Sequence, residues 1–228
     1  MGIRHSSSFS QELRASTTDS WDLEKQHPFI LGIGDGSLPL VNFRYYMLQD
    51  YIFLADFCRV IAMAVAKASS ISDMDWFAKL LHETLGTEMN LHMSFCSEFG
   101  ITEEELKSTS PSPTTMAYTR HLIEVGFSGN AGEIATSILP CSWGYAEIGQ
   151  MLHDNGLPEN HPLYCRWIEM YSSPEFSALA DWLRSFIDRE ADSASEEGRL
   201  RMKQIFLNSS RYEYMFWDSA YNLEAWPI

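Results

Sequence analysis

The segment AGEIATSILPCSWGYAEIGQMLH, residues 131–153, decides the fold of this chain. Its apolar residues recur at spacings of three and four, which predicts an α-helix. Pro140 lies inside the pattern, and because proline lacks an amide proton and frees the carbonyl one turn earlier, we expect a kink there. Cys141 follows directly, and Tyr145 stands four residues later, so a thiol and a phenol share one helix face.

The same periodicity extends outward from this segment, and strand-like alternation is nearly absent, so the sequence predicts an all-α protein with a single domain over residues 1–228. Ser72 stands three residues before Asp75, and Thr102 three before Glu105, which is the spacing of a helix-capping box. The glycines and prolines of HPFILGIGDGSLP, residues 27–39, predict a turn-rich interruption. Further helices are expected at residues 8–25, 41–68, 72–99, 114–125, 163–171, 174–192 and 195–221.

Composition excludes several classes of protein. The 228 residues include 45% hydrophobic and 13% aromatic side chains, which is typical of a folded chain with a sizeable core. The net charge of -15 leaves no basic surface for nucleic acid. We find no signal peptide and no apolar run that could span a membrane, so we expect a cytoplasmic protein. Cysteine spacing fits neither a disulfide framework nor a zinc site, and small core residues are expected at Cys58, Cys96 and Cys165.

Two carboxylates stand on apolar helix faces. Asp50 shares a face with Phe53 and Phe57, and a buried carboxylate requires a partner. That partner is either a tyrosine or arginine of the protein or a bound ligand. Glu213 shares a face with Phe216; enclosed by aromatic rings it would have a raised pKa, which suits a proton donor or acceptor, whereas on the solvent side it would be an ordinary surface glutamate.

Glu88 and His92 stand at i and i+4, a spacing that could present metal ligands. A di-iron bundle needs Glu-x-x-His pairs from two helices, and we find no second pair of this kind. A solvated or interhelical charge cluster is the better interpretation, so no metal site and no cofactor is predicted. Cys141, taken alone, is more typical of a packed core thiol than of a nucleophile.

The chain nevertheless resembles a known family through an ordered set of motifs. HPFILGIGDGSLP, FRYYMLQDY, PSPTTMAYTRH, LPCSWGY, HPLYCRWIEMY and RYEYMFW follow one another in the order and at the separations of the TenA family, over almost the whole chain. The resemblance is to the cysteine-containing branch, known as thiaminase II or aminopyrimidine aminohydrolase. It implies an all-α, haem-oxygenase-like multi-helix bundle that assembles as a homotetramer.

The resemblance also implies roles for individual residues. Cys141 would be the nucleophile, Glu213 the group that transfers protons at the pyrimidine ring nitrogen, and Asp50 the carboxylate that binds the amino group. Position 53 holds Phe where many relatives carry Tyr, so a hydrogen bond is lost there. The remaining pocket residues implied by the resemblance are Phe53, Tyr118, Tyr145, Tyr171 and Phe216.

The implied reaction is hydrolysis of 4-amino-5-aminomethyl-2-methylpyrimidine, and of thiamin, to 4-amino-5-hydroxymethyl-2-methylpyrimidine in thiamin salvage. A thiolate that adds to C6 of the ring lets the group on the 5-methylene depart, and water takes its place. The alternatives are a non-catalytic protein that binds a pyrimidine or has a regulatory role, and a haem-oxygenase-like metal oxidase.

Overall fold

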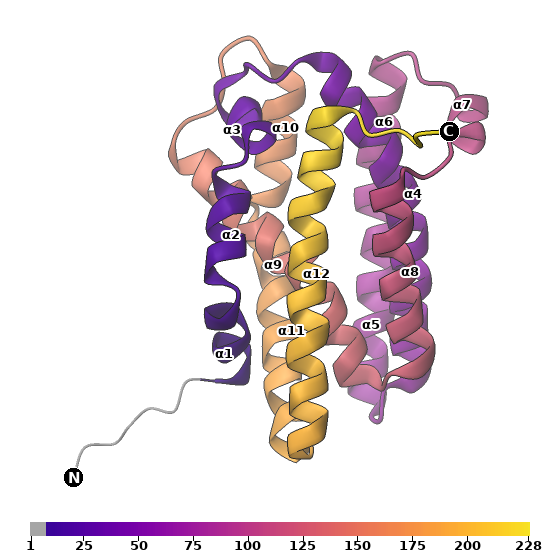
Figure 1. Ribbon diagram of the computed structural model, residues 1–228, viewed down its shortest axis with the longest axis vertical. Helices are drawn as coiled ribbons and strands as arrows, with labels where there is room; N and C mark the ends of the chain where they lie inside the picture. Colours follow the sequence, from indigo (N-terminus) through magenta and orange to yellow (C-terminus); the bar gives the residue numbers. More distant parts are fainter. Residues whose placement is uncertain (1–7) are drawn as a thin grey trace.

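The computed structural model describes residues 8–228, which form a bundle of helices (Figure 1). No strand occurs in this part of the chain, so the all-α prediction is confirmed. Nor does any helix within it combine the length and the apolar character that crossing a membrane requires. The elements are α1 (Phe9–Ser16), α2 (Thr18–Lys25), α3 (Pro28–Asp35), α4 (Leu40–Lys67), α5 (Ile71–Glu83), the π-helix η1 (Thr84–Glu88), α6 (Met89–Glu98), α7 (Glu103–Ser108), α8 (Pro113–Ser128), α9 (Ala131–Asp154), α10 (Pro162–Tyr171), α11 (Pro174–Ser193) and α12 (Glu196–Asn222).

Helix α9 lies in the interior of the bundle, where it contacts α4, α8, α10, α11 and α12 (Figure 1). Every residue from Ala131 to Pro140 is buried, including the polar Glu133, Thr136 and Ser137, because other helices surround this half of α9. The capping box of Asn130 and Glu133 starts α9, and the helix continues through Pro140. The C-terminal half of α9, which begins at Cys141, therefore follows a segment that is fully packed between other helices.

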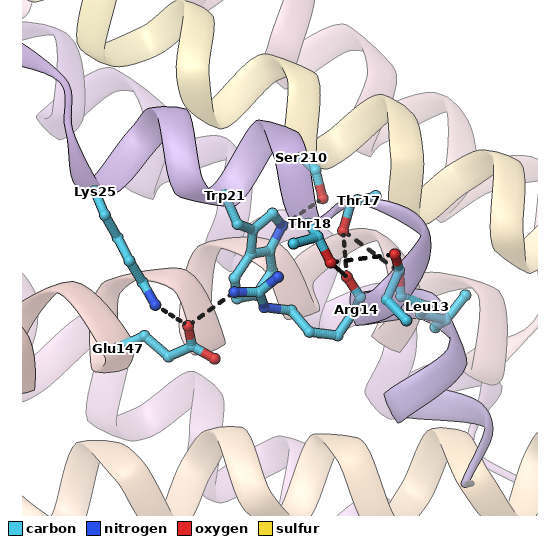
Figure 2. A network of polar contacts seen from close by, with 9 residues as sticks. Leu13, Arg14, Thr17, Thr18, Trp21, Lys25, Glu147 and Ser210 are labelled. Carbon is cyan, nitrogen blue, oxygen red and sulfur yellow. Dashed lines mark hydrogen bonds and ion pairs between the residues drawn. The ribbon is translucent and has the colours of Figure 1, made fainter.

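The single helix predicted for residues 8–25 is wrong, because α1 and α2 are separated at Thr17. The hydroxyls of Thr17 and Thr18 donate to the Arg14 carbonyl at 3.3 and 3.5 Å, and these side chain to backbone bonds compete with continued helix (Figure 2). The break allows Trp21 to insert between helices, where its indole N–H donates to the Ser210 hydroxyl of α12 at 3.0 Å.

The turn-rich interruption predicted for residues 27–39 is also wrong in part, since α3 occupies Pro28–Asp35. Pro28 stands in the first turn, where a missing amide proton costs nothing, and His27 Nδ1 accepts from the Phe29 amide. Gly36, at φ +79°, ends the helix in the left-handed conformation. Burial of apolar residues such as Phe29 outweighs the low helix propensity of the glycines inside the segment.

The helix predicted for residues 72–99 differs in its start and in its middle. Its N-cap is Ser70, whose hydroxyl accepts from the Asp73 amide at 3.0 Å, so the capping box expected at Ser72 is wrong. The run changes to π-helix over Thr84–Glu88, a stretch of low helix propensity around Gly86. The cap expected at Thr102 is confirmed, and the other predicted helices agree to within about three residues at each end.

Candidate active site

Cys141 stands at the midpoint of α9, just beyond the fully packed Ala131–Pro140 segment. It is half-buried, and four carboxyl groups act on it from the surrounding helices. Burial is the main reason that the pKa of the thiol is raised well above its ordinary value, and the negative charges of Glu213, Glu88, Asp50 and Glu24 raise it further. The thiol is therefore protonated at neutral pH in the free protein.

Glu213 of α12, whose charge acts on this thiol, is 2% exposed, so the interpretation as a surface glutamate is wrong. Burial raises its pKa to about 8, an effect that the Asp50 charge reinforces and that a hydrogen bond from Tyr118 opposes. The Tyr118 hydroxyl, which comes from α8, donates to Glu213 Oε1. A glutamic acid with a pKa near neutrality, beside a thiol, can donate or accept a proton under physiological conditions.

Asp50 of α4 is also buried, and its partner is a histidine. His92 Nε2 of α6 lies 3.0 Å from Asp50 Oδ2, with the two side chains 1% and 4% exposed. Burial opposes a charge on the imidazole, but Asp50 and Glu88 outweigh it, so the pKa of His92 is raised. Of the alternatives for Asp50, a protein partner is confirmed, although it is neither tyrosine nor arginine.

Glu88, at the end of η1, approaches the site from the same side as His92. Its carboxylate accepts a hydrogen bond of 3.2 Å from the Tyr171 hydroxyl of α10. Burial raises the pKa of Glu88 to about 7, against the opposing effect of His92. Gly149 allows α10 to come close enough for this contact, because a Cβ atom at that position would lie only 2.5 Å from the backbone of Tyr171.

Aromatic rings form the rest of the site. Phe53 lies with its ring centroid 4.9 Å from that of Tyr118 and 5.7 Å from that of Phe216. The rings of Tyr145 and Tyr171 are 4.8 Å apart. The Tyr145 hydroxyl is 3.4 Å from that of Tyr46, which also accepts from the Trp167 indole at 3.3 Å. The structure thus gathers all eight residues proposed from the sequence into one region of the bundle.

A cavity of about 420 Å³ adjoins this region and shares Glu88 with it. Met170, Phe176 and Leu179 provide an apolar wall, and Glu83 and Glu175 add carboxylates. The volume suits a small molecule, and the bond from Glu88 to Tyr171 connects the cavity wall with the tyrosines of the site.

Sequence reasoning could not name the partners of Glu88 and His92, and it missed Glu24. Of the solvated or interhelical charge cluster predicted for Glu88 and His92, the structure shows the interhelical form, because the two residues contact Tyr171 and Asp50. Among residues 8–228, no group of three His, Cys, Asp or Glu side chains is arranged to hold a metal ion. Glu24 of α2 is 3% exposed, and its Oε1 has no hydrogen-bond partner. The polar sequence TDSWDLEK gives no sign of that burial.

Comparison with known proteins fits this geometry. The model of the TENA/THI-4/PQQC family matches residues 14–223. A protein of Halalkalibacterium halodurans named aminopyrimidine aminohydrolase is 41% identical over 96% of this chain and 98% of its own length. A TenA homologue from P. horikoshii superimposes with a TM-score of 0.86 at 29% identity, covering 95% of this chain and 99% of the other.

A more distant structure supports the fold alone. A domain from Shewanella denitrificans with a heme oxygenase-like fold superimposes with a TM-score of 0.73 at 16% identity, covering 93% of this chain and 92% of the other. The expectation of a haem-oxygenase-like bundle is therefore confirmed.

Proposed function

Because the chain belongs to the TENA/THI-4/PQQC family, we propose that it is an aminopyrimidine aminohydrolase of thiamin salvage, which converts 4-amino-5-aminomethyl-2-methylpyrimidine and water to the 5-hydroxymethyl compound and ammonia. Thiamin, with its thiazole as leaving group, is the second substrate. The observation that supports the proposal is the electrostatic coupling of the Cys141 thiol to two buried carboxyl groups, Glu213 with a pKa of about 8 and Asp50, which is paired with His92.

Substrate binding uses the carboxylate and the rings. The amino group and the adjacent ring nitrogen of an aminopyrimidine form an amidine-like edge, which a carboxylate such as Asp50 binds well. The flat heterocycle stacks on Phe53 and Phe216, whose rings lie 5.7 Å apart and present apolar faces. Phe at position 53 supplies stacking but no hydroxyl, so orientation of the ring relies on Asp50.

The chemistry begins with addition of the Cys141 sulfur to C6 of the ring. The carbon-sulfur bond forms as one double bond of the ring opens, and the ring nitrogen next to C6 takes up a proton. The electron pair on that nitrogen then expels the amino group of the 5-methylene, which is protonated in the substrate and departs as ammonia, and an exocyclic double bond remains. Water adds to the methylene carbon, the proton it releases goes to the ammonia, the carbon-sulfur bond breaks, and the aromatic product is restored.

Glu213 accounts for the protons. Because the pKa of the Cys141 thiol is raised, a thiolate is not present beforehand, and the thiol must lose its proton as the sulfur attacks. The ionised form of Glu213 takes this proton and passes it to the ring nitrogen. After ammonia has left, the same carboxylate removes the proton from the ring nitrogen, and it returns a proton to the sulfur at the end. General acid and base catalysis of this kind contributes about 10²- to 10⁴-fold.

The three tyrosines position these groups. Tyr118 orients the Glu213 carboxyl group through its hydroxyl, and Tyr171 does the same for Glu88. Tyr145 stands one turn after Cys141 on α9, and its ring contacts that of Tyr171. An aromatic enclosure of this kind limits the access of bulk water to the reacting groups.

The proposal includes the assembly and the location that the family implies: one domain, a homotetramer, in the cytoplasm. Apolar side chains are exposed near the start of α4 and the end of α12, namely Leu40, Val41, Met215, Tyr221, Leu223 and Trp226. Covering such residues is what subunit contacts do. Light scattering coupled to size-exclusion chromatography should give about four times the mass of the chain.

The decisive experiment is a steady-state assay of ammonia and hydroxymethylpyrimidine release from the aminomethylpyrimidine and from thiamin. The wild-type protein should turn over at least one substrate, and Cys141→Ala should abolish turnover while binding of the product persists. Cys165→Ala, which changes a half-buried thiol on α10, is the matched control and should remain active. Binding without turnover by the wild type would instead favour a protein that only binds a pyrimidine.

A further inference from the structure

His92 is buried in the site wall but has no part in the reaction described above. We propose that His92 is a positioning residue, which holds the Asp50 carboxylate by a hydrogen bond in the orientation that receives the aminopyrimidine edge. The inference rests on the proposed function, because it assigns the pyrimidine to Asp50. It concerns a residue that acts through Asp50 and does not itself touch the reacting atoms.

The first support is the geometry of the pair. His92 Nε2 is 3.0 Å from Asp50 Oδ2, and since a carboxylate can only accept, Nε2 carries the proton. The bond fixes one carboxylate oxygen and thereby the plane of the group. Oδ1 is then the oxygen directed to a ligand. Both side chains are almost completely buried, so water cannot replace this contact without opening the helices.

The second support is the helix that presents His92. The end of η1 and the start of α6 present two side chains one turn apart: Glu88 contacts Tyr171 of α10, and His92 contacts Asp50 of α4. The Phe95 ring lies edge-on to the imidazole at 6.5 Å and helps to hold it in place. A histidine placed there only to fill the core would not need an ionisable partner across the helix interface.

The third support is the balance of charge. The groups that face His92 from neighbouring elements are Asp50 of α4 and Glu88 of η1, and both favour the imidazolium form against the effect of burial. Glu213 of α12 and Cys141 of α9 lie further into the site and carry no positive charge. An imidazolium therefore neutralises Asp50, so that the carboxylate can be buried before the substrate arrives. His92 Nδ1 has no hydrogen-bond partner, which makes this ring sensitive to what else binds nearby.

The test compares His92→Leu with the conservative His92→Gln, and uses His153→Leu as a control because His153 is an exposed histidine of α9. Isothermal titration with 4-amino-5-hydroxymethyl-2-methylpyrimidine should show about a tenfold or greater rise in Kd for His92→Leu, which corresponds to loss of one charge-assisted hydrogen bond. In the assay, KM should rise by a similar factor while kcat changes less. His92→Gln keeps a donor and should recover most of the affinity. Wild-type affinity in folded His92→Leu would overturn the proposal.

A second measurement keeps the proposal testable if His92→Leu does not fold. Nitrogen-15 NMR of the histidine rings reports the proton on Nε2 and the titration of the ring without any substrate. His92 should titrate above the ordinary histidine pKa in the wild type, and the pKa should fall in Asp50→Asn. An unchanged titration in that variant would contradict the coupling. A wild-type protein that neither binds nor converts the pyrimidine, but shows the coupled titration, would refute the proposed function and leave the His92 to Asp50 contact intact.

Discussion

The two walls that face Cys141 hold their carboxyl groups in opposite ways. On the wall built by α4 and α6, Asp50 is paired with His92 at 3.0 Å. On the wall built by α2 and α12, Glu213 accepts a hydrogen bond from a neutral phenol, and Glu24 Oε1 has no partner. Burial then raises the pKa of both glutamates. The neighbours of each carboxyl group, and not its residue type, therefore decide its role. A carboxylate paired with a cation can bind a ligand, whereas an unpaired buried carboxyl group holds a proton near neutral pH.

The largest effect is expected from removing the ionisable group of Glu213, on the wall built by α2 and α12 (the second wall; that of α4 and α6 is the first). Glu213→Gln should lower kcat for the aminomethylpyrimidine by about 10²- to 10⁴-fold, because no acid or base remains at the ring nitrogen. In the wild type, kcat/KM should rise as pH rises through about 8, where Glu213 becomes the carboxylate that takes the thiol proton. Steady-state kcat/KM measured between pH 6 and 10 should show this limb in the wild type and not in Glu213→Gln.

A control separates this effect from a general change of charge. Glu197→Gln removes an exposed carboxylate near the start of the same helix and should leave both kcat and the limb near pH 8 unchanged. If Glu213→Gln kept the limb, another group would be responsible for it, and the assignment of the proton to this wall would be wrong.

A smaller effect on kcat should follow from removing the Tyr118 hydroxyl, which donates a hydrogen bond to Glu213. Tyr118→Phe removes the hydrogen bond that lowers the pKa of Glu213, so that pKa should rise above about 8, and the rising limb of kcat/KM should move to higher pH. Loss of orientation at Glu213 should lower kcat by about tenfold. Tyr212→Phe is the control, because Tyr212 stacks on Tyr118 with ring centroids 5.3 Å apart and Phe preserves the stacking. A limb that moved to lower pH in Tyr118→Phe would contradict the proposed polarity of this wall.

The first wall could be foreseen only in part. Asp50 stood out because it interrupts an apolar stripe of α4, and burial was the physical conclusion. Its partner could not be chosen from sequence, since His92 belongs to a helix whose rotation depends on the π-helical turn before it. Periodicity gives the face of a single helix but not which faces meet, so the pairing of two helices requires their packing.

The helices of the second wall were likewise predicted only in part from the sequence. The helical pattern predicted α12 and left the burial of Glu213 open, and it predicted α9 to within one residue. The break at Thr17 was missed, although it is what lets α2 carry Glu24 against α9 and α12. Local propensity was a poor guide because the break is decided by the hydroxyl bonds of two threonines and by the space that Trp21 fills.

Glu24 offers a test of the cost of an unpaired carboxyl group. Its pKa is raised well above the ordinary value, chiefly by burial, so the unfolded chain loses this proton at a lower pH than the folded protein does. The group therefore destabilises the fold increasingly as pH rises above about 4.5. Glu24→Gln should raise the Tm at pH 7 by about 2–4 °C, which is on the order of 1 kcal/mol for a protein of this size. Calorimetry at pH 4 should show little difference between the two proteins.

The smallest effect, of opposite sign, is expected at the outer side of this wall, where Glu147 of α9 receives Lys25 at 2.6 Å and Arg14 at 3.2 Å (Figure 2). Burial would raise the pKa of Glu147, but the hydrogen bonds from these two cations outweigh it and the pKa is lowered. Stability from this group is thus present above the unfolded pKa and is lost as pH falls through the folded one. Glu147→Gln should cost about 0.5 kcal/mol at pH 7, since half-buried ion pairs are screened, and nothing at pH 3. Glu24 and Glu147 both interact with Arg14, yet replacement by Gln should raise the Tm at Glu24 and lower it at Glu147. Equal changes in Tm would mean that charge pairing does not distinguish the two glutamates.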